Sequence, residues 1–208
     1  KTSFLTNGIL NKMYVSEAIK TRFSCRAFTK QAVSANLVKE ILDLAKQAPS
    51  GGNLQPWHIH AITGQKLKEI VVDIESKIPD MPMGEKTEYD VYPQNLWDPY
   101  RSRRFKCGED LYKSINIPRE DKGARLKQLA RNFRFFDAPV GLFVYIDRKM
   151  GPPQWSDVGM FLQTIMLIAR EKGLHSCAQE AWAMWHSTVE RHLIVDNDLM
   201  LFCGMGIG

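Results

Sequence analysis

Two arginines and a serine near the beginning of the chain have the types and spacing best suited to binding an anion. Arg22, Ser24 and Arg26 alternate along a segment with the character of extended chain, so their side chains should share one face. A guanidinium presents a planar fork of donors that matches phosphate oxygens, and a serine adds a hydroxyl group. The pattern indicates a phosphate site, although two surface arginines paired with nearby acids would have the same spacing.

The other reactive residue types give weaker indications. No Gly-x-Ser-x-Gly or His-Glu-x-x-His motif occurs, so neither a serine hydrolase nor a zinc protease is predicted. His58 and His60 would point the same way on a strand and could bind a metal, but no third ligand is evident. Structural histidines explain them better, and Cys177 is typical of a packed thiol. We therefore assign no metal and no nucleophile.

The charge of the chain is concentrated in one stretch. The 208 residues have a formal net charge of +5, and the stretch from Arg101 to Arg134 holds 11 basic and four acidic side chains. Such a local field favours phosphates, nucleotides or carboxylates, or nucleic acid, whereas a solvated helix face would have the same composition. An apolar fraction of 44% and a charged fraction of 25% exclude a wholly disordered or fibrous chain.

The cysteines and apolar runs predict the compartment. Four scattered cysteines do not suit a disulfide framework and favour a reducing compartment, so we expect a cytoplasmic protein. No apolar run reaches the roughly 20 residues that a membrane span needs, so no membrane partner is expected.

The periodicity of apolar residues and the positions of proline and glycine predict the helices and strands that must position these residues. Four of the ten prolines fall between 79 and 99, so we expect an irregular, aromatic-rich excursion at about 79–117 that packs on or covers another part of the molecule. The helix at 157–172 is apolar nearly all round, which predicts a core or interface position. Together the elements predict one α+β domain over residues 1–208, with helices packed on a mainly antiparallel sheet. The predicted helices span 14–22, 34–48, 64–78, 118–135, 157–172 and 189–193, and the predicted strands span 57–63, 140–146 and 199–207.

Six segments, taken in order, resemble one known family. They are RFSCRAF (22–28), APSGGNLQPW (48–57), NFRFFDAP (132–139), DVGMFLQ (157–163), GLHSCAQEA (173–181) and CGMGIG (203–208). The set is similar to the FMN-dependent nitroreductase family over residues 14–208. The resemblance implies a nitroreductase-like fold and an intimate homodimer with two FMN sites at the interface. It also implies a ping-pong cycle in which NAD(P)H reduces the flavin, and flavin N5 then passes hydride to nitroaromatic or quinone-like acceptors.

The resemblance also implies roles for particular residues. Arg22 and Ser24 would hold the FMN phosphate and ribityl chain, and Arg26 would stabilise negative charge at the pyrimidine edge. A loop lent by the partner subunit and a segment along the flavin ring would complete the site, and no proton donor or catalytic residue is assigned. The loop residues are Pro49, Ser50, Gly51 and Asn53; the ring residues are Ala178, Gln179 and Glu180, with Asn132 near the pyrimidine carbonyls.

Several alternatives stay open at this point. Family members usually continue beyond the last glycine-rich strand into a basic tail, and we expect such a tail to complete the phosphate site. The basic stretch predicts a preference for NADPH or for a carboxylated nitroaromatic. A reductive dehalogenase or a flavin-degrading enzyme would share the flavin motifs, and a basic nucleic-acid-binding domain is the alternative from another class.

Overall fold

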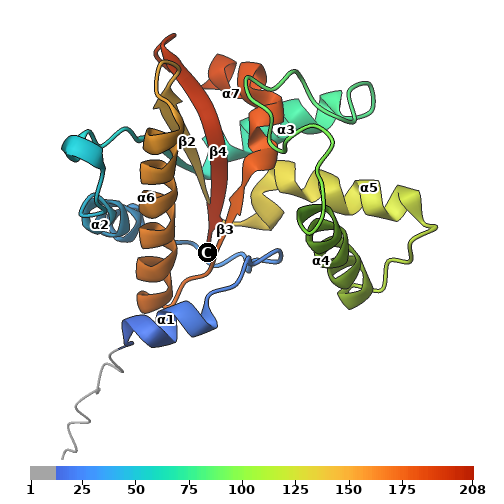
Figure 1. Ribbon diagram of the computed structural model, residues 1–208, viewed down its shortest axis with the longest axis horizontal. Helices are drawn as coiled ribbons and strands as arrows, with labels where there is room; N and C mark the ends of the chain where they lie inside the picture. Colours follow the sequence, from blue (N-terminus) through green and yellow to red (C-terminus); the bar gives the residue numbers. More distant parts are fainter. Residues whose placement is uncertain (1–12) are drawn as a thin grey trace, which may run out of the picture.

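The computed structural model describes residues 13–208 and centres on a four-stranded sheet (Figure 1). The strands are β1 (His58–Thr63), β2 (Val140–Asp147), β3 (Ser176–Gln179) and β4 (Leu199–Ile207), in the order β1-β2-β4-β3. Every neighbouring pair is antiparallel, which confirms the predicted sheet. β2 is a continuous run of mostly apolar residues and lies inside the sheet, between β1 and β4. Because layers cover both faces of the sheet there, its residues from Val140 to Ile146 are all buried.

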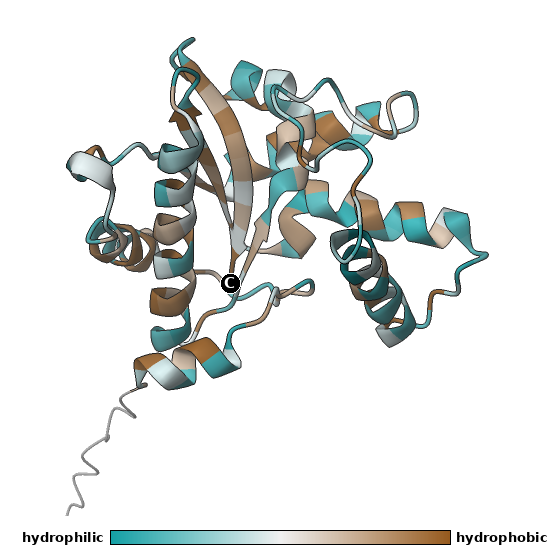
Figure 2. Cartoon of the chain, in the orientation of Figure 1, coloured by the Kyte–Doolittle hydropathy of each residue, from teal (hydrophilic) through white to brown (hydrophobic). Residues whose placement is uncertain are grey.

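The alternation of side chains along β2 divides the core into two layers. Leu142 and Val144 face α2 (Ala35–Ala45) and the long helix α6 (Pro152–Glu171). Phe143 and Tyr145 face the opposite layer, which contains α3 (Gly64–Lys77) and α7 (His186–His192). Apolar residues are concentrated on the sheet and on the inner faces of these helices (Figure 2). The helix α1 (Val15–Thr21) lies near the end of α6.

One glycine is required by the second layer. Gly204 in β4 is opposite Phe143 in β2, and the ring of Trp182 lies against its backbone. A Cβ atom at position 204 would lie 2.3 Å from Trp182 Cδ1, closer than any real contact. Trp182 belongs to the short 3-10 segment η3 (Glu180–Trp185), so this close approach holds the chain after β3 against the sheet.

The region expected to be irregular contains a helix. The prediction for 79–117 is wrong for its second half, where α4 (Tyr100–Ser114) forms immediately after Pro99. Its 15 residues include no proline but also no buried residue, so the apolar periodicity that reveals a helix in sequence is missing. The assignment of residues 1–208 to a single domain stays a prediction, and its first 12 residues lie outside those described.

Several other boundaries differ from the predictions for local reasons. The helix predicted at 118–135 is shorter: α5 (Lys122–Ala130) begins where the Asp121 carboxylate accepts the Ala124 N–H, 2.8 Å away. It is followed by a 3-10 segment, η2 (Arg131–Asp137), in which buried Phe135 and Phe136 have φ near +51° and +52°. α6 begins five residues earlier than predicted, because prolines suit a first turn. β3 was not predicted, because four residues show no alternation.

The helices carry no feature of a membrane span. Within residues 13–208, no helix combines the length and the apolar character needed to cross a bilayer.

Candidate functional site

The extended segment that follows α1 lies beside β3. Ser24 forms an isolated parallel bridge with Ser176, and the Cys25 N–H donates to the Ser176 carbonyl at 3.0 Å. Further along, the Phe28 N–H donates to the Phe136 carbonyl at 3.3 Å. These backbone contacts hold residues 22–28 extended, as predicted, between β3 and η2.

The two predicted arginines have no carboxylate partner among residues 13–208. Neither Arg22 nor Arg26 forms an ion pair there, and Arg26 Nη1 makes only a long contact of 3.4 Å to the Ser24 carbonyl. Both guanidinium groups lie near Cys177 of β3 and act on its thiol. Burial nevertheless raises the pKa of that thiol to about 11, so Cys177 is protonated at neutral pH. Two half-buried cations without a counterion favour an anionic ligand at this position.

Two predicted ring residues are joined directly to each other. The buried Gln179 side chain donates to the Asn132 carbonyl at 2.8 Å and to Asn132 Oδ1 at 3.2 Å. Gln179 Oε1 and the neighbouring Ser176 hydroxyl are buried without a hydrogen-bond partner in the described chain. An unpartnered buried polar atom is costly, so each of these groups is suited to a polar partner, on opposite faces of β3 because they are three residues apart on the strand.

The neighbouring residues expose small or charged groups at the same edge. Ala178 and Glu180 flank Gln179 and are exposed, which leaves this face of β3 open. Protein packed around the carboxyl raises the pKa of Glu180 above its ordinary value, even though the residue keeps much of its surface in contact with solvent. Arg22, Ser24, Arg26, Asn132 and residues 178–180 are therefore brought together, from three separate segments.

The other predicted segment lies elsewhere in the same chain. The loop containing Pro49, Ser50, Gly51 and Asn53 is positioned by the amide of Gly51, which donates to buried Asp157 Oδ2 at the start of α6, 3.2 Å away. The Ser50 hydroxyl accepts the Gln55 N–H at 2.9 Å. The loop lies on the other side of α6 from β3 (Figure 1), so one chain does not bring it to the arginines.

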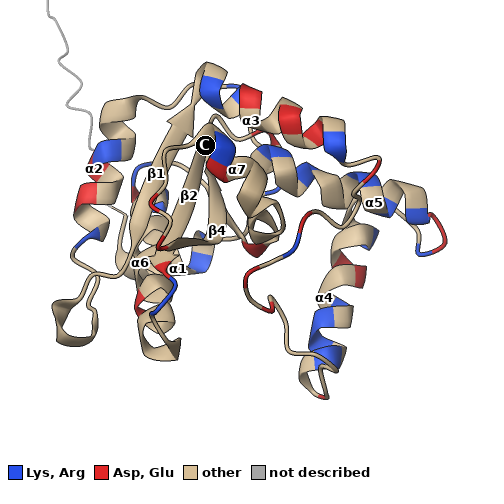
Figure 3. Cartoon of the chain, turned by 90° about the horizontal axis from the view of Figure 1, so that it is seen from above, with Lys and Arg blue, Asp and Glu red and all other residues tan. Residues whose placement is uncertain are grey.

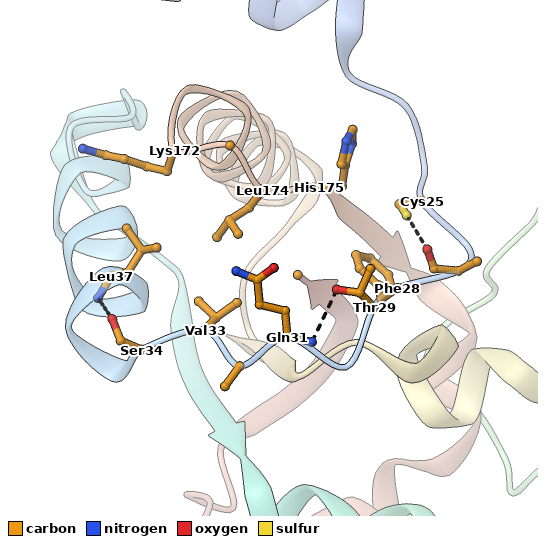
Figure 4. A pocket seen from close by; sticks show the side chains of 14 residues that line it. Cys25, Phe28, Thr29, Gln31, Val33, Ser34, Leu37, Lys172, Leu174 and His175 are labelled. Atoms are coloured by element: carbon orange, nitrogen blue, oxygen red, sulfur yellow. Dashed lines mark hydrogen bonds between the residues drawn. The ribbon is translucent and has the colours of Figure 1, made fainter. Parts of the chain in front are cut away.

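A pocket next to the arginine segment is distinct from this site (Figure 4). It has a volume of about 580 Å³ and is lined by residues of 25–37 and 172–175 and by Gly208. None of the predicted cofactor residues lines it. Its one cationic side chain, Lys172, already pairs with Glu40. The pocket therefore lacks the free positive charge found at Arg22 and Arg26.

Two contributors to the site were not predicted. The Ser176 hydroxyl and the Asp157 carboxylate have no motif of their own, and their roles depend on the pairing of β3 and on the approach of the 49–53 loop to α6. The only available signal was their position inside two of the segments that carry the resemblance. His58 and His60, considered above as metal ligands, lie on β1, where His60 packs edge-on against the Tyr145 ring with centroids 5.5 Å apart.

Comparisons with known proteins identify the family of this chain. The profile of the nitroreductase family matches residues 19–208. The chain is 38% identical over 195 residues to a nitrobenzene nitroreductase of Ectopseudomonas oleovorans, covering 94% of this chain and 86% of the relative. It is 36% identical over 190 residues to a 4-nitrobenzoate reductase of Pseudomonas putida, covering 91% of this chain and 82% of the relative.

A solved structure shares the fold closely. The FMN- and NADPH-dependent nitroreductase NfnB from Sphigopyxis sp. strain HMH is 46% identical, with a TM-score of 0.91, and the match covers 94% of this chain and 88% of that one. The four-stranded antiparallel sheet with helices on both faces is thus a nitroreductase fold. The chain belongs to the nitroreductase family.

Proposed function

We propose that this protein is an FMN-dependent nitroreductase that uses NAD(P)H to reduce nitroaromatic or quinone-like acceptors. The observation that carries the proposal is that two arginines without an ion pair among residues 13–208 lie near Cys177 of β3, two residues before Gln179, whose side chain donates to Asn132. The names of the relatives and of the similar structure support the cofactor and the reaction class.

The residues at this face fit the chemical groups of FMN. Arg22 and Ser24 would hold the phosphate and the ribityl chain, because a dianion needs the unpaired guanidinium that Arg22 offers. Arg26 would place positive charge at the pyrimidine edge, with Asn132 and residues 178–180 beside the ring. Bound FMN supplies the two-electron redox chemistry at its N5 atom. The chain itself positions the ring and keeps Cys177, a potential competing nucleophile, protonated.

A second copy of the chain would complete the site. Apolar side chains are exposed at the start of α1, where the N-cap residue Tyr14 is 69% exposed and Val15 and Ile19 of the helix are 70% and 54% exposed, and on α6, where Met160 is 39% exposed. Such a patch is typical of a protein interface. A homodimer that buries it would let the partner's 49–53 loop reach the flavin, with Pro49, Ser50, Gly51 and Asn53 close to the ring. We propose two flavin sites per dimer and a small aromatic substrate.

The experiment that tests the function is spectroscopic. The purified protein should be yellow, should lose its flavin absorbance on anaerobic addition of NADPH, and should regain it when nitrobenzene is added. Arg22→Ala should weaken FMN binding roughly 10- to 100-fold, the effect of removing a hydrogen-bonded charge. Arg119→Ala, a change of an exposed arginine remote from β3, should leave it unaffected. A colourless protein that takes up no FMN, or equal FMN affinity in the two variants, contradicts the proposal.

A further inference from the structure

Three potential metal ligands meet outside the candidate cofactor site. His186 and Glu190 are one turn apart on α7 and share a face, and Glu88 reaches them from the segment 79–99. His186 Nδ1 lies 3.6 Å from Glu190 Oε1 and 3.7 Å from Glu88 Oε2. The three ligand atoms all lie within 4.8 Å of one another.

The atoms that face each other are all electron-rich. His186 Nδ1 and Glu190 Oε1 are buried and have no hydrogen-bond partner among residues 13–208. The other ring nitrogen, Nε2, lies 3.4 Å from the Ser187 hydroxyl. In the tautomer in which Nε2 donates to that oxygen, Nδ1 has a free lone pair. These three side chains are only 17–28% exposed, and a lone pair that faces two carboxylate oxygens there is stabilised by a cation between them.

The distances distinguish the two possible cations. A proton on Nδ1 would serve neither oxygen well, because 3.6 and 3.7 Å exceed a normal hydrogen bond. By contrast, ligand atoms about 2.1 Å from Zn²⁺ in a tetrahedral arrangement lie about 3.4 Å apart, and small departures from the ideal angle bring this to the separations seen here. The observed separations therefore suit a divalent metal ion better than a proton.

A fully buried hydroxyl group beside the cluster points to the same conclusion. The Tyr145 side chain is 0% exposed, and its hydroxyl has no hydrogen-bond partner among the described residues. Burial raises the pKa of this phenol, and the charged groups that add to the effect are Glu190 and Glu88. Because this hydroxyl is within hydrogen-bond distance of neither carboxylate, it can donate only to a group bound between them, such as a metal-bound water.

The remaining carboxylate oxygen of Glu88 already has a partner. Arg148 Nε and Nη2 both lie 2.8 Å from Glu88 Oε1, and Arg148 also donates to the Asn197 carbonyl. This contact orients Glu88 so that Oε2 faces His186. It also offsets one negative charge, so a divalent ion would leave the cluster with an excess of only about one positive charge.

We propose that Glu88, His186 and Glu190 bind a divalent transition-metal ion, with Zn²⁺ as the test case. Tyr145 would donate a hydrogen bond to a water molecule bound to that ion. The ion would attach the segment 79–99 to α7, just before that segment leads into α4. Glu85 makes a parallel attachment, since its carboxylate accepts the Thr188 N–H at 3.0 Å and the Thr188 hydroxyl at 2.7 Å. The site is structural and does not depend on the proposed redox function.

Metal binding to the tag-free full-length protein, with any bound cofactor retained, tests the proposal. After dialysis against a chelator, calorimetric titration with ZnCl₂ should give one site per chain, and Co²⁺ should produce visible absorption. His186→Gln and Glu190→Gln should each weaken Zn²⁺ binding at least tenfold, and Tyr145→Phe should weaken it less. His192→Gln should leave it unchanged, because His192 lies on the same helix but pairs with Asp73 at 2.8 Å.

A second variant keeps the test decisive if a change on α7 prevents folding. Glu88→Gln alters a loop residue, and its circular dichroism should match that of the unmodified chain while Zn²⁺ affinity falls at least tenfold. The proposal is wrong if the unmodified protein takes up no Zn²⁺ or Co²⁺ at this stoichiometry. It is equally wrong if Glu88→Gln and His192→Gln bind Zn²⁺ as tightly as each other, since the ion would then reside elsewhere.

Discussion

The sheet and the arm are held in place by different forces. We use "arm" for residues 79–130, which contain the segment 79–99, α4 and α5. In β2 the residues from Val140 to Ile146 are buried, whereas α4 and α5 have no buried residue at all. Within the arm, α4 and α5 are joined to each other by the two-pronged pair in which Arg125 donates to Glu109 at 2.6 and 3.0 Å. The segment 79–99 is attached to the rest of the chain through Glu85, whose carboxylate accepts from Thr188, and through Tyr89, whose ring stacks on that of Phe202. Basic side chains are gathered along α4 and α5 (Figure 3).

This difference gives the sheet and the arm different roles. Apolar burial holds the sheet rigidly, so β3 and the arginine segment have a fixed platform. The arm exposes Trp97, Tyr100 and Phe105, and its helices α4 and α5 have no buried residue, so the place of these helices can respond to a substrate or a second chain. We therefore expect changes in the sheet to alter stability and changes in the arm to alter selectivity.

Matched truncations of phenylalanine should give the largest contrast. Phe143→Ala removes a ring that is 0% exposed and should lower the free energy of unfolding by about 3–5 kcal/mol. Phe105→Ala removes a ring that is 52% exposed and contacts the Arg119 guanidinium, so it should cost less than about 1 kcal/mol. Denaturant unfolding of both variants measures the difference. Similar costs would show that the arm is packed as tightly as the sheet.

Salt should weaken the selectivity of the arm without changing the sheet. If the basic face of α4 attracts anionic acceptors, kcat/KM for 4-nitrobenzoate should fall roughly 3- to 10-fold between low and high ionic strength. The value for neutral nitrobenzene should change little. Arg103→Ala should reduce the salt effect, and Lys39→Ala on α2 serves as the control. Equal salt dependence for both acceptors would remove the assigned role of the arm.

Acid should loosen the arm before the sheet. Hydrogen bonding to Arg125 holds the pKa of the Glu109 carboxyl below its usual range. The pair therefore contributes its full stability above the unfolded carboxyl pKa of about 4.3, and that contribution is lost as the pH falls through the lowered folded-state value. Hydrogen exchange in residues 100–130 should accelerate over that interval. In Glu109→Gln the exchange should be fast already at pH 7, while exchange in β2 is unaffected.

The smallest expected difference between the arm and the sheet is in the reactivity of their thiols, which can be measured without changing the stability of the protein. Cys107 in α4 is exposed, whereas Cys25, Cys177 and Cys203 are buried. A disulfide reagent at pH 8 should label one thiol per folded chain, and Cys107→Ser should abolish that reaction. Cys177 should stay unlabelled, because burial raises its pKa to about 11 and leaves almost no thiolate. Rapid labelling of more than one thiol would indicate that the sheet opens.

Local patterns in the sequence predicted the parts of the fold that local forces decide. The apolar residues from 140 to 146 predicted a strand, which is β2, and the helix predicted at 34–48 begins with Ser34, whose hydroxyl accepts the Leu37 N–H at 3.2 Å. These features depend on neighbours within a few residues. The helix α4 was missed for the complementary reason, since a helix without a buried face has no apolar period to detect.

The sequence by itself determined the chemistry of the site, because the alternating Arg22, Ser24 and Arg26 and the ordered family segments are properties of the chain. Tertiary structure decided which distant residues meet. The pairing of Ser24 with Ser176 and the contact of Gln179 with Asn132 join positions far apart in the chain, and so does the approach of Glu88 to His186. Such contacts follow from the packing of the two layers around β2, which no short stretch of sequence encodes.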